Sequence, residues 1–278
     1  MIEKILEYCT FPFVQNALIV GGLIALCSSL FGTTLILQRF SFIGDGLSHA
    51  AFGVFAIAAV LKIAAPMTVV LPFMVICAIL LLNFGKKIGG DVAIAMISVG
   101  MLGIGYLVLS IFLPSSNISG DVCNMLFGTT AILTLSSSEI VLCVLVSLVA
   151  VFVFIFGYNR IFAVSFDFDF AQSSGINAGL WKIIIASVVA VVIVLAMTLV
   201  GSLLVCALIV FPGFCAMQIC TTFRTVTIAS AVIGLCSTVL GLLISIGASS
   251  PVGPTIVCVF LTVLLIVSLL KNLRHARA

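Results

Sequence analysis

The sequence predicts an all-α integral membrane protein, built as a polytopic bundle of eight or nine transmembrane helices. First, 64% of the 278 residues are hydrophobic and only 7% are charged, whereas soluble domains carry roughly 25% charged residues. Second, the mean hydropathy is +1.50, and apolar runs recur at about 20 residues, the length that crosses a hydrocarbon core of about 30 Å as a helix. Third, these runs lack the strict alternation of membrane β-strands.

Nine apolar runs are candidate spans. They cover residues 13–37, 40–61, 66–84, 92–113, 140–156, 180–200, 202–219, 226–246 and 253–270. Gly201 and Ser202 form only a weak break between two of them, and Pro212 interrupts the second, so eight full crossings plus a broken one fits equally well. Residues 1–16 carry both charge signs and are expected to form a short interfacial lead-in rather than a cleaved signal.

The basic residues predict the orientation. With the loops placed alternately on two sides, one side receives only Lys4 and Lys62. The other side receives Arg39, Lys86, Lys87, Arg160, Arg224, Lys271, Arg274 and Arg277. Because cytoplasmic loops carry the excess of Lys and Arg, we expect the N-terminus outside and the C-terminus in the cytoplasm. Lys182 fits this assignment, since a lysine near a helix end can reach the interface.

Two connections are longer than turns. The outer one, 114–139, contains an apolar piece from Asn124 to Leu135 that could form a partial or re-entrant helix. The inner one, 157–179, is amphipathic and acidic at Asp167 and Asp169. Gly175 and Asn177 near its end are residues that tolerate a helix C-cap, so we expect a short cytoplasmic helix there. The chain has no GxxxxGK[ST] phosphate loop, and nothing in it suggests nucleic-acid binding.

Ten cysteines are scattered singly, without a CxxC pair. Most lie within apolar runs, where a free cysteine behaves as a small buried hydrophobe. They are Cys9, Cys27, Cys77, Cys123, Cys143, Cys206, Cys215, Cys220, Cys236 and Cys258. We therefore expect neither disulfides nor a thiolate metal site.

Asp45 and His49 are the most informative residues. A helix running unbroken from Arg39 would place His49 about 15 Å further on, near the middle of the core. The i, i+4 spacing puts both residues on one face, on a stripe with Ser48, Phe52, Gly53 and Ala56. A charged aspartate at the bilayer centre costs about 2.5 to 3.5 kcal/mol, so the pair is expected to face a cavity or the protein interior.

Several roles for the pair remain open. The two side chains could be bonded to each other and hold two helices in register, or act as a proton relay. A carboxylate oxygen with an imidazole nitrogen also suits Zn(II), Mn(II) or Fe(II). One chain supplies too few ligands for a closed site, but a twofold homodimer would bring two Asp45 and two His49 together. Gly100, Gly103 and Gly105 are expected to allow close helix packing.

The stretch QRFSFIGDGLSHA, residues 38–50, resembles the signature of the permease subunits of bacterial ABC importers for zinc, manganese and iron, the ABC-3 family. Weaker matches follow in the expected order over nearly the whole chain: DVAIAMISVGMLGIG, LFGTTAILTLS, FDFDFAQSSGIN, VGSLLVCALIVFPGFCA and PVGPTIV. The chain departs from the family pattern at Ala51, Phe52 and Gly53, at Ser249, and at Gly213, Phe214 and Cys215.

The resemblance implies one ABC transporter transmembrane domain over residues 1–278 in the bacterial plasma membrane. It implies a homodimer, with two cytoplasmic ATPase subunits that hydrolyse the ATP and a metal-binding lipoprotein or periplasmic protein outside. Asp45 and His49 would contact or gate the transported metal. Asp167, Phe170, Ala171 and Gly175 would belong to a coupling helix that docks on the ATPase. No cofactor is expected to be bound permanently, and the cargo is expected to be Zn(II) or Mn(II), with a slight preference for zinc.

Two other functions remain compatible with the residues. A proton-coupled secondary metal transporter would use Asp45 and His49 as a relay and need no ATPase, although no internal repeat of the kind common in that class is evident. An ABC permease for a larger metal chelate would need a wide cavity and no ionic ligand. His275 lies in a basic tail that is expected to face anionic cytoplasmic lipid, and it is expected to take no part in transport.

Overall fold

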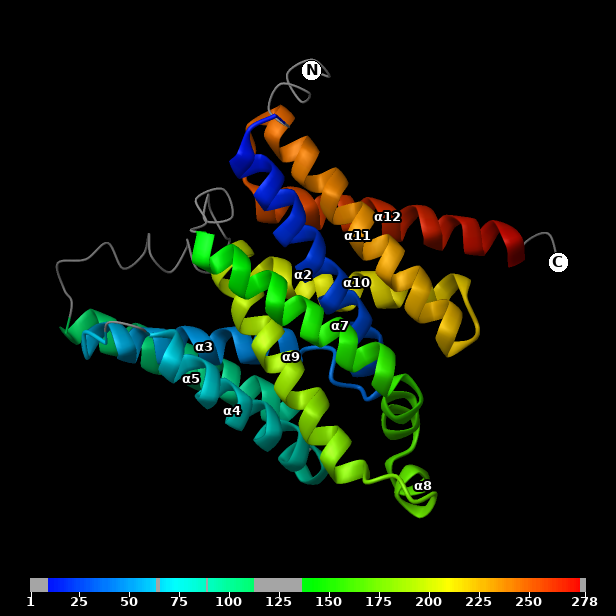
Figure 1. Ribbon diagram of the computed structural model, residues 1–278, viewed down its shortest axis with the longest axis horizontal. Helices are drawn as coiled ribbons and strands as arrows, with labels where there is room; N and C mark the ends of the chain where they lie inside the picture. The colour runs from blue at the N-terminus through cyan, green and yellow to red at the C-terminus, as the bar shows by residue number, and fades with distance from the viewer. Residues whose placement is uncertain (1–9, 64–65, 89, 113–136, 276–278) are drawn as a thin grey trace.

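The computed structural model describes residues 10–63, 66–88, 90–112 and 137–275. This part of the chain is helical and contains no strand (Figure 1). The helices are α2 (Pro12–Leu37), α3 (Ile43–Val60), α4 (Met67–Ile88), α5 (Gly90–Phe112), α7 (Ser137–Phe166), α8 (Phe168–Ser173), α9 (Ala178–Val200), α10 (Ser202–Ile219), α11 (Phe223–Ala248) and α12 (Val252–His275). The prediction of an all-α membrane bundle is confirmed. The outer segment from Asn124 to Leu135 and the lead-in before residue 10 lie outside the described residues.

Eight helices of the described chain are long and apolar enough to cross a membrane. The ninth apolar segment, Met67–Leu82 of α4, is shorter, and α4 contains Pro72. The doubtful break at Gly201 is sharp, because Gly201 has φ 87° and ψ 157°, and its amide bonds to Met197 at the end of α9. This combination of a positive φ with an extended ψ is open essentially to glycine alone. α9 and α10 are therefore two separate candidate spans, and the weaker candidate is α4.

α7 continues beyond its predicted end. The apolar run ends at residue 156, but the helix extends to Phe166 and has 30 residues, about 45 Å of length. The interpretation of residues 157–166 as a connection was wrong, because this part of α7 has its own packing. A Cβ on Gly157 would meet the Trp181 ring of α9, and the Arg160 guanidinium lies 5.4 Å from the centre of that ring. These contacts keep the last turns of α7 against α9.

α2 lies at the centre of the bundle and is buried over most of its length. It packs against α7, α9, α10 and α11 (Figure 1). The approach to α10 is close: a Cβ on Gly32 would meet the carbonyl oxygen and carbon of Ile209. Towards α7, the rings of Phe31 and Phe154 meet edge to face at 5.2 Å. A helix buried on all sides needs apolar or small residues around its whole circumference, and α2 has them.

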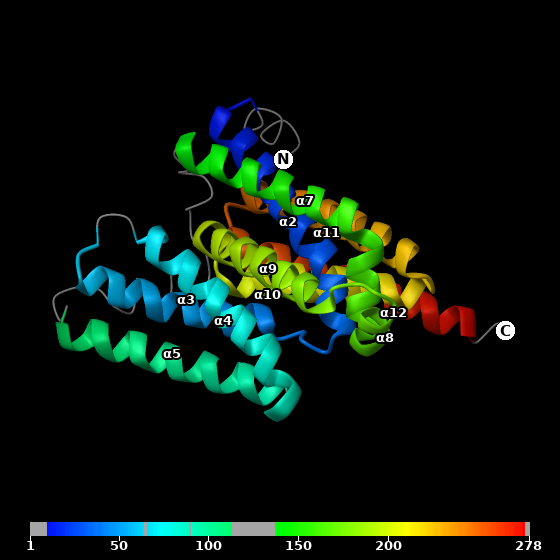
Figure 2. The same cartoon turned by 60° about the horizontal axis from the view of Figure 1, so that its bottom comes forward.

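α3 and α5 form a tight pair on one side of the molecule, with α4 beside them (Figure 2). A Cβ on Gly53 would lie 2.6 Å from the carbonyl oxygen of Met101, and one on Gly105 would lie 2.9 Å from the Cα of Gly53. The expected packing role is thus confirmed for Gly105. Within the described chain no neighbouring helix comes within 4 Å of the Cβ position of Gly100 or Gly103, so their expected packing role stays a prediction. Both face outwards on α5.

Candidate functional site

Asp45 lies in the first turn of α3. The premise of an unbroken helix from Arg39 was wrong: Arg39 has φ 62°, and α3 begins only at Ile43. The depth calculated from that helix therefore does not apply. The N-cap residue Phe42 has no side chain that can cap the helix, and no cap bond from a side chain is formed there. A carboxylate in the first turn is still favoured by the helix dipole.

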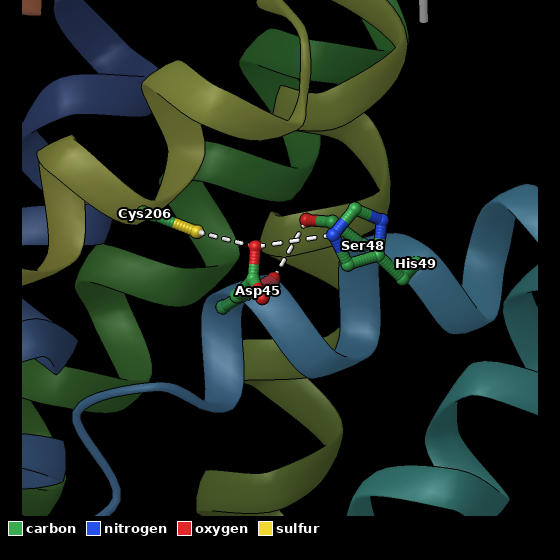
Figure 3. Close-up of polar contacts among 5 residues, drawn as sticks. Asp45, Ser48, His49 and Cys206 are labelled. Atoms are coloured by element: carbon green, nitrogen blue, oxygen red, sulfur yellow. Dashed lines mark hydrogen bonds and ion pairs between the residues drawn. The ribbon is translucent and has the colours of Figure 1, made fainter. Parts of the chain in front are cut away.

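Asp45 and His49 are in contact (Figure 3). The Nε2 atom of His49 lies 3.3 Å from Oδ1 of Asp45, one helical turn away. The His49 side chain is 16% exposed, whereas that of Asp45 is 47% exposed. The carboxylate therefore reaches the surface of the single chain, and the imidazole lies beneath it. The predicted sharing of one face is confirmed.

Two further helices reach the Asp45 carboxylate. The Cys206 thiol of α10 donates to Oδ1 of Asp45 at 3.8 Å, from the side opposite His49 (Figure 3). The hydroxyl of Ser98 on α5 also interacts with this carboxylate. Asp45 is thus the point at which side chains of α3, α5 and α10 converge. Sequence reasoning missed Cys206, because 161 residues separate it from Asp45 and no spacing pattern joins the two.

The free atom of the imidazole is Nδ1. It is buried, and it has no hydrogen-bond partner in the described chain. When Nε2 donates its proton to Asp45, Nδ1 keeps a lone pair that no described group uses. Neutral imidazole nitrogen and carboxylate oxygen are ligands of zinc and manganese. Within the described residues, no three or more His, Cys, Asp and Glu side chains are grouped so as to hold a metal ion.

The remaining residues of the predicted stripe serve packing. The Ser48 hydroxyl donates to the carbonyl of Gly44 in its own helix at 2.7 Å, and Ser48 is 1% exposed. Phe52 and Gly53 face α5, where the Phe52 ring lies against Gly105. The polar part of the stripe is therefore limited to Asp45 and His49.

The alternative of a purely structural pair requires a bond between two helices. Asp45 and His49 lie on the same helix, so their contact does not join α3 to any neighbour. The bond to the neighbouring helix α10 comes from a thiol, which is a weak donor. Apolar packing through Gly53 and Gly105 already fixes α3 against α5. The contacts of Asp45 with Ser98 of α5 and Cys206 of α10 are the ones through which the pair could serve this structural role.

α8 is the short helix expected between α7 and α9, and it lies at the end of the bundle opposite the start of α2 (Figure 1). Asp167 is its N-cap, and Oδ1 of Asp167 accepts bonds from the backbone amides of Asp169 and Phe170, each at 3.0 Å. Such caps satisfy amides that the first turn leaves unpaired. A helix of six residues depends on its ends, because it is too short to be stable alone.

The other end of α8 closes in a Schellman motif. Gly175 has φ 84°, its amide bonds to Gln172, and the Ile176 amide bonds to Ala171. Ala171 is completely buried, against a small cluster with Val164 and Ala178, whereas Phe170 is 68% exposed. Among the four predicted coupling residues, three therefore build the helix and Phe170 presents an apolar ring to the outside. Asn177, expected as a C-cap, instead caps the start of α9 by accepting from Leu180.

One side-chain bond connects the α8 end of the molecule to the segment before α3. The Gln38 amide, at the C-cap of α2, donates to the Ser165 hydroxyl of α7 at 3.0 Å. Ser165 precedes Asp167 by two residues, and Gln38 precedes the first residue of α3 by five. A separate hydrogen bond joins α9 to α4, because the Lys182 ammonium donates to the carbonyl of Leu82. The turn leading to Asp45 is thus held to the helix leading to α8.

A polytopic helical bundle with an ionisable pair on a candidate membrane-spanning helix is typical of membrane transport proteins. The chain belongs to the ABC 3 transport family, whose sequence profile matches residues 10–271. The resemblance inferred from the 38–50 motif is therefore confirmed.

Relatives and a solved structure agree with this assignment. The chain is 26% identical to the manganese import system permease protein ScaB of Streptococcus gordonii, over 89% of this chain and 87% of ScaB. It is 24% identical to the high-affinity zinc uptake system membrane protein ZnuB of Buchnera aphidicola, over 90% of this chain and 94% of ZnuB. The structure of PsaBC from Streptococcus pneumoniae in complex with Fab matches with a TM-score of 0.82 at 24% identity, over 96% of this chain and 95% of the matched chain.

Proposed function

We propose that the chain is the membrane-spanning subunit of an ATP-driven importer that moves a divalent transition metal ion into the cytoplasm. The observation that carries the proposal is the Asp45–His49 pair, whose carboxylate is half exposed and whose Nδ1 atom is buried without a partner. Ionisable residues in a membrane span mark a transport path by default. The family membership favours an ATP-driven system over a proton-coupled secondary transporter.

In this proposal, Asp45 and His49 bind the ion transiently. A passing dication offsets the carboxylate charge and displaces the bond between Oδ1 and Nε2, so that both groups turn to the metal. Two copies of the chain supply four ligands, the number that zinc prefers. The outward-facing Gly100 and Gly103 of α5, the helix that packs on α3, support a homodimer whose seam includes this side of the molecule, since small residues allow membrane helices to approach.

Zinc is the preferred cargo in this proposal, with manganese as the alternative. Cys206 adds a sulfur atom beside the Asp45 carboxylate. Its proton is on the sulfur, however, so the preference rests on the His49 imidazole, which suits zinc, whereas manganese prefers oxygen ligands such as carboxylate and water. Relatives named for manganese and for zinc match the chain about equally well, so their names do not decide between the metals.

The proposed partners follow from the two ends of the bundle. Two cytoplasmic ATPase subunits would dock on α8, where the exposed Phe170 ring would enter a groove of the partner and the Asp167 cap would hold the helix. A metal-binding lipoprotein or periplasmic protein would deliver the ion on the opposite side. This places α8 and the C-terminus in the cytoplasm and the N-terminus outside, as the basic residues predict.

The experiment measures zinc and manganese uptake by proteoliposomes that contain the permease with its ATPase. The metal-loaded binding protein is added on the side opposite the ATPase. Asp45→Ala and His49→Ala should each abolish uptake, while the dimer and the bound ATPase remain. Phe52→Leu is a matched control on the same helix face, and its uptake should persist. Full uptake by both alanine variants would refute the proposal.

A further inference from the structure

A long groove runs along the outside of the bundle between α7 and α11, with α2 as its floor. It encloses about 720 Å³. Leu26, Leu30 and Phe154 form the buried or half-buried floor, while the rims carry Ile155 and Phe156 from α7 and Ile228 from α11. These three rim side chains are 63%, 74% and 56% exposed. A trough of this kind on a membrane protein faces lipid chains or another apolar surface.

The groove is apolar along most of its length and polar at one end. Tyr158, Asn159 and Arg224 line this end, which lies towards the last turns of α7 and the first turn of α11. No acidic residue lines the groove. The Tyr158 and Phe223 rings, with centres 5.3 Å apart, close the base of the groove and hold α7 against α11. Arginine beside tyrosine is the combination found where membrane helices meet the headgroup layer.

The dimensions of the groove match one acyl chain in one leaflet. Its α7 wall runs from Val151 to Asn159, and its α11 wall from Arg224 to Ala231. At 1.5 Å per residue these walls are about 12 Å and about 10 Å long. Half of a hydrocarbon core is about 15 Å. A chain lying in the groove would therefore reach from near the bilayer centre to the polar end, and its headgroup phosphate would meet the Arg224 guanidinium.

We propose that this groove binds an anionic phospholipid of the cytoplasmic leaflet, with one acyl chain along Leu30, Phe154 and Ala231 and the phosphate on Arg224. The position of Arg224 at one end of the groove favours a phospholipid as the occupant. Its guanidinium would pair with a phosphodiester, whereas an apolar protein surface would leave it without a partner. Basic pockets between membrane helices on the cytoplasmic side are known to take anionic headgroups. This lipid site does not depend on the proposed cargo or on any step of transport.

The test measures which lipids stay bound to the full-length chain. The protein is reconstituted in vesicles of equal parts phosphatidylglycerol and phosphatidylcholine, extracted in mild detergent, and analysed by native mass spectrometry. The wild type should retain phosphatidylglycerol about fivefold over phosphatidylcholine, the ratio expected for one arginine near an anionic surface. Arg224→Gln should remove this preference without removing bound lipid.

A second pair of variants fills the groove. Ala231→Phe should displace lipid of both headgroups, whereas Val232→Phe, next to it on α11 and already 55% exposed outside the groove, should leave retention unchanged. Only variants that elute as a folded species in size-exclusion chromatography are compared. Equal retention of the two lipids by the wild type, or undiminished lipid in Ala231→Phe, would overturn the proposal. A protein dimer that Ala231→Phe dissociates would assign the groove to a second copy and equally overturn it.

Discussion

Two aspartates each lie at the start of a helix, and their bonds differ. Oδ1 of Asp167 accepts from two backbone amides of α8, which accounts for the residue as a cap. Oδ1 of Asp45 accepts from the side chains of His49 and Cys206, and α3 has no side-chain cap at Phe42. A carboxylate bonded to its own backbone is explained by local folding. A carboxylate bonded to side chains from two helices, and half exposed among apolar residues, requires another explanation, and the proposed passage of a cation would supply one.

Substituting asparagine for each of the two aspartates, Asp45 and Asp167, should give the largest difference in uptake. Asparagine caps a helix about as well as aspartate, so Asp167→Asn should keep uptake near the wild-type level. Asp45→Asn removes the charge that offsets the dication. Loss of a group that only supports a metal ligand typically costs 10 to 100-fold in affinity or activity, so loss of a ligand itself should lower uptake by at least about a hundredfold. Radiolabelled zinc uptake at matched protein levels measures both, and equal uptake in the two variants would erase the distinction.

Acidification should act on the Asp45–His49 pair in one direction. Imidazole is the side chain that changes charge between pH 5 and 8, and only its neutral form binds a metal. Protons therefore compete with the cation, and uptake should fall as the pH is lowered. The pH is kept equal on both sides of the vesicle membrane, so that no proton gradient drives transport. Uptake is divided by the ATPase rate, so that an effect of pH on ATP hydrolysis is removed. Uptake per ATP that rises as the pH falls would instead indicate a proton-coupled mechanism.

Cys206 tests whether the sulfur beside Asp45 contributes to metal choice. Cys206→Ser keeps a donor of similar size but replaces a soft atom by a hard one. Groups next to metal ligands typically alter affinity or activity by 10 to 100-fold, and we expect the zinc-to-manganese uptake ratio to fall by about tenfold. Cys215→Ser, at a buried cysteine of the same helix, is the matched control. An unchanged ratio would mean that Cys206 is packing alone.

Asp167→Ala should give the smallest effect and should leave Asp45 unaffected. Loss of an N-cap costs about 1 kcal/mol, so the amides of α8 should exchange with deuterium about fivefold faster. Hydrogen exchange of residues 168–173 measures this, with Asp167→Asn as the variant that retains protection. Unchanged exchange in Asp167→Ala would show that the Schellman motif at Gly175 and the burial of Ala171 hold α8 without the cap.

The sequence was sufficient to predict the membrane-spanning helices and the contact between Asp45 and His49. It was insufficient to predict where α7 ends and where α3 begins. Span lengths follow from the thickness of the bilayer, and the i, i+4 spacing alone brings Asp45 to His49. The end of α7 was misplaced because its last turns are stabilised by tertiary contacts of Gly157 and Arg160 with Trp181. The start of α3 was misplaced because nothing in the residues 39–42 signals a positive φ at Arg39.

The partner helix of Asp45 could not be predicted for a different reason. Cys206 reaches the carboxylate only because α10 turns at Gly201 and packs against both α2 and α3. Its sequence surroundings are as apolar as those of the other cysteines. A long-range contact of this kind depends on the packing of three helices, whereas composition and periodicity describe one helix at a time.

The central claim is that Asp45 and His49 hold the cation in transit. A structure of the dimeric permease with its ATPase, determined with zinc and with anomalous data at the zinc absorption edge, tests it directly. The account predicts an anomalous peak at the seam, within about 2.0 to 2.2 Å of a carboxylate oxygen of Asp45 and a ring nitrogen of His49. Zinc bound elsewhere along the path, with Nε2 of His49 still on Oδ1 of Asp45, would contradict it.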